Sequence, residues 1–321
     1  MADRTFILDM DVGIDDALAI IYLAGSPGIE IAAVGSVHGN VGAELAALNA
    51  RRVLELCGLP HVPVAIGCRQ PLAQPLETAE WVHGTDGLGN TNQPLPAEGP
   101  TAEHAANQLV RLVRERPGYY EVLATGPLTN LALALLLEPE LPTLVRSVVV
   151  MGGSASGIGN ATPSAEANIW HDPEAARLMF EAGWPITMVG LDVTDVTLFS
   201  AVDLDALAAA PTAHARFAAA ILEHSADVRT RLLGGARGCE LHDPLAAGIA
   251  VDAGYVLQAV SAPIEVSLQG PTRGMTIVDR REHRLPGHDE RSQVLVPLAV
   301  DSQRFVCDLM ATLVSPSAAG A

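Results

Sequence analysis

Short apolar runs alternate with longer amphipathic stretches, and this alternation restricts the fold of the chain more than any other feature. Runs of strand length lie at residues 5–8, 30–37, 62–66, 119–124, 147–151 and 186–190. Stretches with helical periodicity lie between or after them, at residues 15–24, 43–57, 102–115, 128–137 and 173–182. Repeated strand-then-helix units predict an α/β fold with an open, mainly parallel but mixed central sheet and helices on both faces.

The last third of the chain is less regular. We expect helices at residues 203–209, 213–226 and 303–313 and after Asp243, and strand-like runs at 255–268, 273–279 and 293–298. Residues 67–100, 152–170 and 227–240 have the Gly-rich and polar composition of loops. Because no repeat or linker divides the chain, we predict one domain over residues 1–314 and a frayed tail at 315–321. Ligands of such sheets bind beyond the carboxyl ends of the strands.

The charge composition narrows both partners and chemistry. The 321 residues include 37 acidic and 19 basic side chains, and the formal net charge of −18 argues against a nucleic-acid partner. Every basic residue is arginine, so no lysine is present for Schiff-base chemistry or for a P-loop. The four cysteines form no CxxC motif and are expected to be reduced thiols. Without a signal-peptide pattern or an apolar run of membrane-spanning length, we expect a cytoplasmic protein with no membrane partner.

Four carboxylates lie within eight residues where the first predicted strand gives way to a helix: Asp9, Asp11, Asp15 and Asp16. Like charges this close raise one another's pKa unless a cation neutralises them. Carboxylate oxygens without nearby cysteine suit a hard ion such as Ca²⁺ or Mg²⁺. A simpler interpretation is that acids favour a helix N-terminus, but this explains only the last two of the four.

Polar motifs follow other predicted strands, and each has an ordinary structural interpretation when taken alone. Gly39-Asn40 follows the second strand, and Met151-Gly152-Gly153 ends a later one. The segments at 125–132 and 242–246 resemble helix starts, since a proline near the first turn is common there. Polar residues in a Gly-rich loop are typical of turns but can also bind sugar hydroxyls.

Together these segments resemble the inosine-uridine nucleoside hydrolase family over essentially the whole chain. The family motif DxDxGxDD corresponds to residues 9–16, GN to 39–40, TGPLTNLA to 125–132, MGG to 151–153, E-x-N-x-x-x-D-P to 166–173, and HDPLA to 242–246. The resemblance implies a Ca²⁺-dependent enzyme that hydrolyses the N-glycosidic bond of ribonucleosides to ribose and free base. It also implies a homodimer or a homotetramer.

The resemblance assigns roles to individual residues. It implies that Ca²⁺ is held by Asp11, Asp16, the carbonyl of Thr125 and Asp243, and that Asp11 also takes a proton from the metal-bound water. His242, with His83, would lie beside the leaving base, which departs more easily when a histidine protonates it. Asp9 would support the cluster without touching the metal. The ribose, whose transition state resembles an oxocarbenium ion, would be held by Asp15, Asn40, Met151, Asn160, Glu166 and Asn168.

The sequence departs from the family pattern in three places. Met10 and Val12 replace the usual Thr and Pro of the first motif, and Ala167 replaces a common aromatic residue, which would enlarge the pocket. The segment 226–231 lacks the Tyr or Phe that often lines the base pocket, so Arg229 or Arg231 is a candidate to act there. The preference for purine or pyrimidine bases stays open.

The sequence is compatible in part with three alternative functions. A haloacid-dehalogenase-like phosphatase would share the Asp9-Met10-Asp11 pattern but needs a lysine, which this chain lacks. A non-catalytic binding protein on the same scaffold would be favoured by broken metal ligands, yet all four candidate positions carry suitable groups. A hydrolase of a modified or unusual nucleoside is the third alternative.

Overall fold

The main sheet determines where the site lies. In the computed structural model, which describes residues 3–231, 234–281 and 291–315, this sheet has eight strands in the order β3-β2-β1-β4-β5-β6-β12-β9. Each neighbouring pair from β3 to β12 is parallel, and the edge strand β9 is antiparallel to β12. The predicted mainly parallel, mixed sheet is therefore confirmed. The strands are β1 (Arg4–Met10), β2 (Ile29–Ser36), β3 (Val64–Ile66), β4 (Tyr120–Ala124), β5 (Ser147–Met151), β6 (Ile186–Val189), β9 (Val256–Ala262) and β12 (Val294–Val300).

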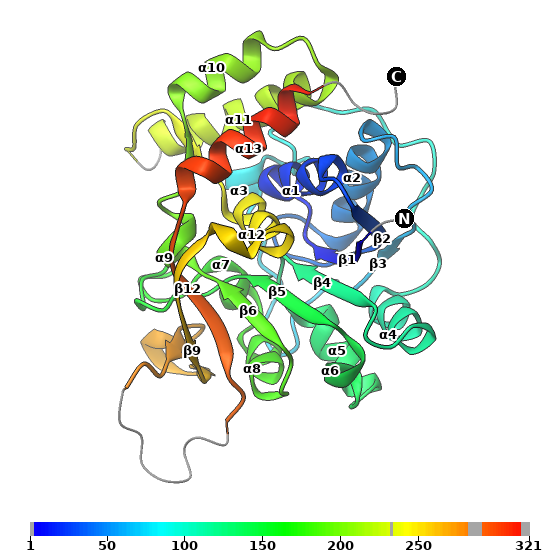
Figure 1. The fold of residues 1–321 in the computed structure, drawn as a ribbon, viewed down its shortest axis with the longest axis vertical. Coiled ribbons are helices and arrows are strands. Elements are labelled where there is room, and N and C mark those ends of the chain that lie inside the picture. The colour runs from blue at the N-terminus through cyan, green and yellow to red at the C-terminus, as the bar shows by residue number, and fades with distance from the viewer. Residues whose placement is uncertain (1–2, 232–233, 282–290, 316–321) are drawn as a thin grey trace.

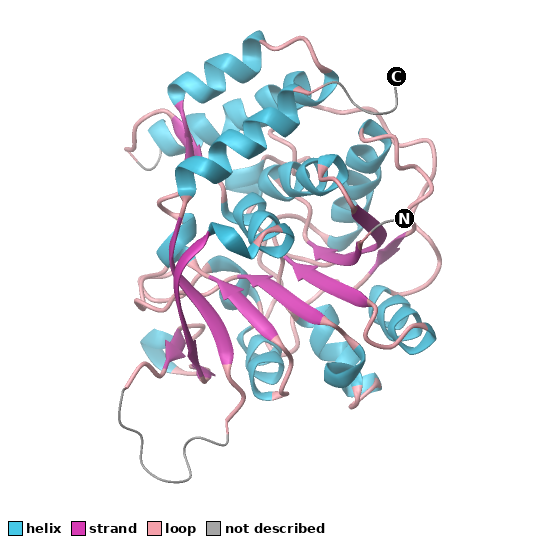
Figure 2. Cartoon of the chain, in the orientation of Figure 1, coloured by secondary structure: helices cyan, strands magenta, loops and turns pink. Residues whose placement is uncertain are grey.

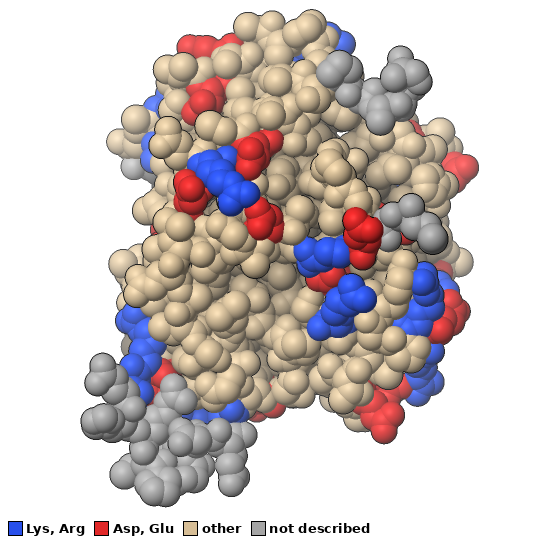
Figure 3. Space-filling view, viewed as in Figure 1, with Lys and Arg blue, Asp and Glu red and all other residues tan. Residues whose placement is uncertain are grey.

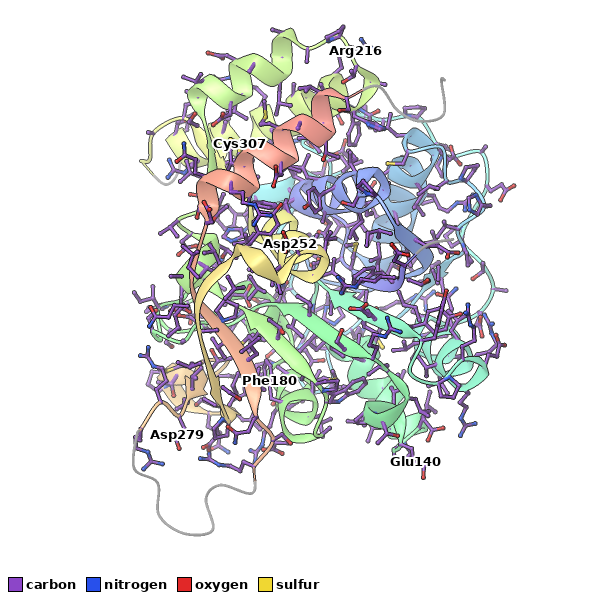
Figure 4. All side chains as sticks on the ribbon, viewed as in Figure 1. Glu140, Phe180, Arg216, Asp252, Asp279 and Cys307 are labelled. Carbon is purple, nitrogen blue, oxygen red and sulfur yellow. The ribbon has the colours of Figure 1, made fainter. Side chains whose placement is uncertain are left out.

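Helices cover both faces of the sheet, as Figures 1 and 2 show. Successive side chains of a strand point to opposite faces, so Phe6 and Leu8 of β1 belong to one apolar core and Ile7 to the other. Phe180 of α8, labelled in Figure 4, belongs to the same core as Ile7. The first core includes α1 (Ile14–Gly25), α2 (Ala43–Leu56), α11 (Ala213–Arg231), α12 (His242–Val251) and α13 (Ser302–Val314), and the second includes α4 (Ala105–Glu115), α5 (Thr129–Leu137) and α8 (Pro173–Glu181).

Short elements account for most differences from the prediction. The predicted loops at 67–100 and 152–170 contain α3 (Glu80–His83) and α7 (Ala167–His171), which are too short to produce a helical period in the sequence. Further short elements are α6 (Leu141–Leu144), α9 (Leu191–Thr194), α10 (Ala201–Ala209), the antiparallel pairs β7 (Leu198–Ser200) with β8 (Gly238–Glu240) and β10 (Ile264–Val266) with β11 (Thr276–Val278), and two 3₁₀ turns, η1 (Ala253–Tyr255) and η2 (Gly270–Thr272).

Two predicted segments need correction. The run 255–268 is not one strand, because Pro263, which has no N–H for a ladder, separates β9 of the main sheet from β10 of the small hairpin. The predicted loop 227–240 begins as the last turns of α11, which continues to Arg231, and ends as β8. Residues 316–321 of the predicted frayed tail lie outside the described residues.

The surface and the helix lengths bear on possible partners. Across the described ranges, no helix combines the length and the apolar character needed to cross a membrane. On the face drawn in Figure 3, arginine side chains lie next to acidic ones, and broad uncharged areas separate these groups. Arg304, for example, pairs with Asp252 at 2.5 Å. Among the described residues, this face therefore shows no continuous basic stripe of the kind that follows a phosphate backbone.

Candidate active site

Asp11 lies directly beyond the end of β1 and is fully buried. Its carboxylate accepts hydrogen bonds from the backbone N–H of Asn40 at 2.7 Å and from the Asn40 side-chain amide at 3.2 Å. A Cβ at position 39 would lie only 2.0 Å from Oδ2 of Asp11, so only glycine fits there. The backbone φ of Gly39, +153°, is also unfavourable for residues with a side chain. The Gly39-Asn40 pair therefore lets the loop after β2 close around this carboxylate.

Asp16 connects three loops at the carboxyl edge of the sheet. It lies in the first turn of α1 and accepts hydrogen bonds from the N–H of Gly13 at 2.8 Å, the amide of Asn40 at 3.1 Å and the hydroxyl of Thr125 at 2.6 Å. Burial, together with repulsion from Asp15, raises the pKa of Asp16 to about 7. A buried carboxylate with this environment is poised to be neutralised by a bound cation.

Asp243, in the first turn of α12, completes a cluster of acidic groups. Its carboxylate and those of Asp15 and Asp16 can place one oxygen each within 4.8 Å of one another. Burial and repulsion from neighbouring aspartates raise the pKa values of Asp243 and Asp11 well above their usual range. Among the described residues, Oδ1 of Asp15 is buried without a hydrogen-bond partner. This all-oxygen donor set, with an unsatisfied acceptor, fits a hard divalent cation.

The expected ligand set and the observed triplet overlap but differ. Asp16 and Asp243 belong to both, whereas the triplet contains Asp15 in place of Asp11. Asp11 adjoins the triplet because the amide of Asn40 donates to both Asp11 and Asp16. The carbonyl of Thr125, the fourth expected ligand, accepts a hydrogen bond from the Asn168 amide at 2.7 Å and has a second lone pair.

Several expected ribose-binding groups also hold the loop after β5 in place. The Glu166 carboxylate caps α7 and accepts from the backbone N–H groups of Gly153, Asn168 and Ile169 at 3.0, 2.9 and 3.1 Å. The Asn168 amide donates to the Met151 carbonyl at 3.2 Å, and the Asn160 side-chain oxygen accepts from the N–H of Ala167 at 2.9 Å. Glu166 and Asn168 are therefore buried and oriented by these hydrogen bonds, whereas Asn160 is exposed.

A pocket of about 560 Å³ lies above the acidic cluster. This volume is within the usual range of small-molecule sites. Asp11 and Asp16 are not among its lining residues and lie beneath it. The expected binding and ligand residues that do line it are Asp15, Asn40, His83, Thr125, Met151, Asn160, Glu166, Asn168, His242 and Asp243.

The structure distinguishes the two arginine candidates. Arg229 lines the pocket, where its Nε donates to Glu240 at 2.6 Å and its Nη1 donates to the carbonyl of Ala236. Arg231 does not line it; its side chain is 75% exposed and pairs with Asp227 at 3.3 Å. Arg229 is the only arginine that lines this pocket in the part of the chain that the structure describes.

The two histidines expected near the base are both held by hydrogen bonds. Nδ1 of His83 accepts from the N–H of Ile14 at 3.1 Å, and burial lowers the pKa of His83. Nδ1 of His242 lies 2.8 Å from the hydroxyl oxygen of Thr194. Each ring thus has its second nitrogen available for other contacts.

Some sequence-based expectations concern residues outside the pocket. Asp9 accepts from the Asn130 amide at 2.8 Å, and burial raises its pKa to about 7. Met10 and Val12 are fully buried in the apolar core. None of these three side chains lines the pocket.

Sequence reasoning missed part of the pocket wall. The pocket is also lined by residues that the sequence analysis did not single out: Trp81, Trp170, His171, Asp195 and Glu240. Trp81 and Trp170 lie in or beside the short helices α3 and α7, which the sequence does not reveal. Two of these residues have a signal in the sequence: Trp170 lies within the motif at 166–173, and Glu240 lies two residues before the motif at 242–246.

Known proteins with similar sequences cover nearly the whole chain. Residues 6–307 match the family described as inosine-uridine preferring nucleoside hydrolase. The inosine-uridine preferring nucleoside hydrolase of Leishmania major is 38% identical, with 95% of each chain covered. The pyrimidine-specific ribonucleoside hydrolase RihA of Salmonella dublin is 37% identical, with 95% of this chain and 96% of the relative covered.

Solved structures agree with the sequence matches. A plant nucleoside hydrolase superposes with a TM-score of 0.93 at 32% identity, covering 98% of this chain and 99% of the other. A purine-preferring ribonucleoside hydrolase from Gardnerella vaginalis gives 0.90 at 33% identity, covering 97% and 98%. These values extend the similarity from the motifs to the complete fold.

Proposed function

Because this chain belongs to the inosine-uridine preferring nucleoside hydrolase family, we propose that it is a Ca²⁺-dependent enzyme that hydrolyses the N-glycosidic bond of ribonucleosides, releasing ribose and the free nucleobase. Hydrolysis of ribonucleosides is the activity shared by the relatives named above. The observation that carries the proposal for this chain is the cluster of Asp15, Asp16 and Asp243 at the floor of a pocket of small-molecule size.

The proposed metal ligands are Asp11, Asp16, Asp243 and the carbonyl of Thr125. When bound, Ca²⁺ supplies positive charge to the cluster and lowers the pKa of a coordinated water. Asp11 is proposed to accept a proton from the attacking water, and its orientation is supported by the two hydrogen bonds that Asn40 donates to it. Asp9 supports this arrangement through its contact with Asn130.

The ribose is proposed to lie against Asp15, Asn40, Met151, Asn160, Glu166 and Asn168. The unpaired Oδ1 of Asp15 is an acceptor for a sugar hydroxyl. Glu166 and Asn168, fixed by hydrogen bonds to the backbone, present oxygen atoms whose orientation is set before substrate arrives. Such preorganised negative charge stabilises the oxocarbenium-like transition state.

The leaving base is proposed to lie beside His242, with His83 nearby and Arg229 at the same end of the pocket. His242 is proposed to donate a hydrogen bond from its ring N–H to the departing base, which stabilises the negative charge that develops on it. Arg229 has guanidinium hydrogens beyond the two used by Glu240 and Ala236, and these can contact a base acceptor. By resemblance, we also propose a homodimer or homotetramer, which light scattering would identify.

A metal-depletion assay tests the central proposal. Purified protein is incubated with a panel of purine and pyrimidine ribonucleosides, and free ribose is measured with and without exhaustive chelation. We expect chelation to abolish activity, Ca²⁺ to restore it, and Ca²⁺ to raise the melting temperature, because binding to the folded state alone stabilises it. Full activity in metal-free protein, verified by elemental analysis, would refute Ca²⁺ dependence, and absence of ribose from every nucleoside would refute the activity.

A further inference from the structure

The hydrogen bond between Thr194 and His242 joins two elements that are distant in sequence. Thr194 is the last residue of α9, and His242 is the first residue of α12. The Thr194 side chain is completely buried, and its hydroxyl oxygen lies 2.8 Å from Nδ1 of His242. Over the described ranges, this is the only hydrogen bond of the Thr194 hydroxyl.

The burial of Thr194 restricts the direction of this hydrogen bond when the imidazole is neutral. If Nδ1 carried the hydrogen and donated to the threonine oxygen, the hydroxyl hydrogen would be buried without an acceptor, which is unfavourable. If the hydroxyl donates to Nδ1, both groups are satisfied. The neutral ring then carries its hydrogen on Nε2, because the hydrogen bond at one ring nitrogen determines the tautomer.

The other ring nitrogen has no hydrogen-bond partner among the described residues. This atom, Nε2, belongs to a histidine that lines the pocket. This atom is also absent from the buried polar atoms that lack a partner, so it is accessible to a ligand. The Nε2–H group is therefore a donor that faces the space proposed for the leaving base.

We propose that Thr194 is a positioning residue that holds the neutral imidazole of His242 in the Nε2–H tautomer and presents this hydrogen to the leaving base. The catalytic part of this inference rests on the proposed function, whereas the tautomer itself does not. A donor that is correctly oriented before substrate binds needs no reorganisation during bond cleavage. A substrate whose leaving group is stable without a hydrogen bond, such as a nitrophenyl riboside, gains little from Thr194.

Nitrogen NMR of the Ca²⁺-loaded enzyme measures the tautomer directly. Protein labelled with ¹⁵N-histidine is compared with His242→Gln, which identifies the signals of this residue among the 10 histidines. We expect a protonated Nε2 and an unprotonated Nδ1 in the neutral ring of the wild type. In Thr194→Val this bias should be lost, and the rate on the best natural nucleoside should fall about tenfold or more, with a smaller loss on the nitrophenyl riboside. Thr194→Ser, which retains the hydroxyl, should restore both properties.

Thr197 provides a matched control. It is equally buried and three residues away, but its hydroxyl contacts Val193 and Ser302 rather than the pocket. Thr197→Val should therefore leave the His242 tautomer and the ratio of the two substrate rates close to wild type, and thermal melting verifies that each variant folds. An Nδ1–H tautomer in the wild type, or a Thr194→Val variant with unchanged spectrum and rates, would overturn the inference. If no nucleoside is hydrolysed, the proposed function fails while the NMR spectra still decide the tautomer.

Discussion

The two ends of the pocket are built differently. The carboxylate end is formed by Asp11, Asp15 and Asp16, which follow β1, together with Asp243 of α12. Hydrogen bonds from Asn40 and Thr125 hold Asp11 and Asp16 in place. The end proposed for the leaving base is lined by Arg229, Glu240 and His242, and the buried Thr194 is hydrogen-bonded to His242. These residues come from α9, α11, β8 and α12. Its polar contacts are two separate sets: the bond of Thr194 with His242, and the bonds of Arg229 with Glu240 and Ala236.

This difference is consistent with two proposed tasks: the carboxylate end acts on the sugar, and the other end binds the base. Every ribonucleoside has the same sugar and the same bond to be cleaved, so the groups that activate water and hold ribose have little freedom to change. Bases differ in size and in hydrogen-bond pattern, and a wall built from a helix face can exchange side chains without moving the sheet. A relative named as pyrimidine-specific is 37% identical to this chain in sequence. A structure named as purine-preferring superposes on it with a TM-score of 0.90, so different base preferences occur among proteins similar to this one.

The largest effect is expected at the carboxylate end. Asp11→Ala should lower kcat/KM by about 10³-fold or more on natural nucleosides and on a nitrophenyl riboside alike, because both need an activated water. Steady-state kinetics on the two substrates measure this loss. Asp227→Ala, which removes a carboxylate that is half-exposed on α11, is the control and should remain active. If Asp11→Ala spared either substrate, water activation would have to be assigned to another group.

A substrate-dependent effect is expected at the leaving-base end. His242→Ala should lose ~10²- to 10⁴-fold on a natural nucleoside, the range for one acid–base group or one preorganised hydrogen-bond donor, and far less on the nitrophenyl riboside. The ratio of the two losses separates leaving-group activation from general damage to the site. Equal losses on both substrates would make the role of His242 structural, and His83 would become the next candidate for the acid.

The ribose contacts predict discrimination between sugars. Inosine should be preferred over 2′-deoxyinosine by about 10²-fold in kcat/KM, because a site built to bind a hydroxyl is left with unpaired groups when it is missing. Asp15→Ala should narrow this preference, since it removes Oδ1 of Asp15, a buried acceptor without a partner among the described residues. Equal rates on the two nucleosides would remove the proposed ribose-binding roles.

The smallest effect concerns the choice between two arginines. Arg229→Gln should change kcat/KM by about tenfold on at least one natural nucleoside, the range of a hydrogen bond to a charged group, and should alter the ranking of bases. Arg231→Gln is the matched control, because its side chain is largely exposed and lies outside the pocket. A comparison of both variants over the nucleoside panel tests this, and identical profiles would exclude Arg229 from base recognition.

Most of the main sheet and its large helices could be predicted from apolar periodicity. The run 147–151 coincides with β5, and the helix predicted at 43–57 differs from α2 by one residue. Short elements such as α3, α7 and α9 could not be predicted, because four or five residues contain no measurable period. The end of α11 was misplaced because Gly and Arg residues after position 226 resemble a loop.

The sequence by itself determined which groups meet around Asp11 and Asp16 at the carboxylate end, because these groups are close along the chain or follow adjacent parallel strands. Asp11 and Asp16 come from one motif, and strand order brings Asn40 and Thr125 to the same sheet edge. Local spacing and sheet topology are sufficient for this convergence, since parallel strands place their carboxyl ends together.

Only the tertiary structure decided which side chains form the leaving-base end. Arg229 and Arg231 are two residues apart, which on a helix is a rotation of about 200°, so one faces the pocket and the other faces solvent. Thr194 meets His242 across 48 residues of chain. Both contacts depend on how α9, α11 and α12 pack against the sheet, and this packing is set by many weak apolar contacts that leave no local pattern in the sequence.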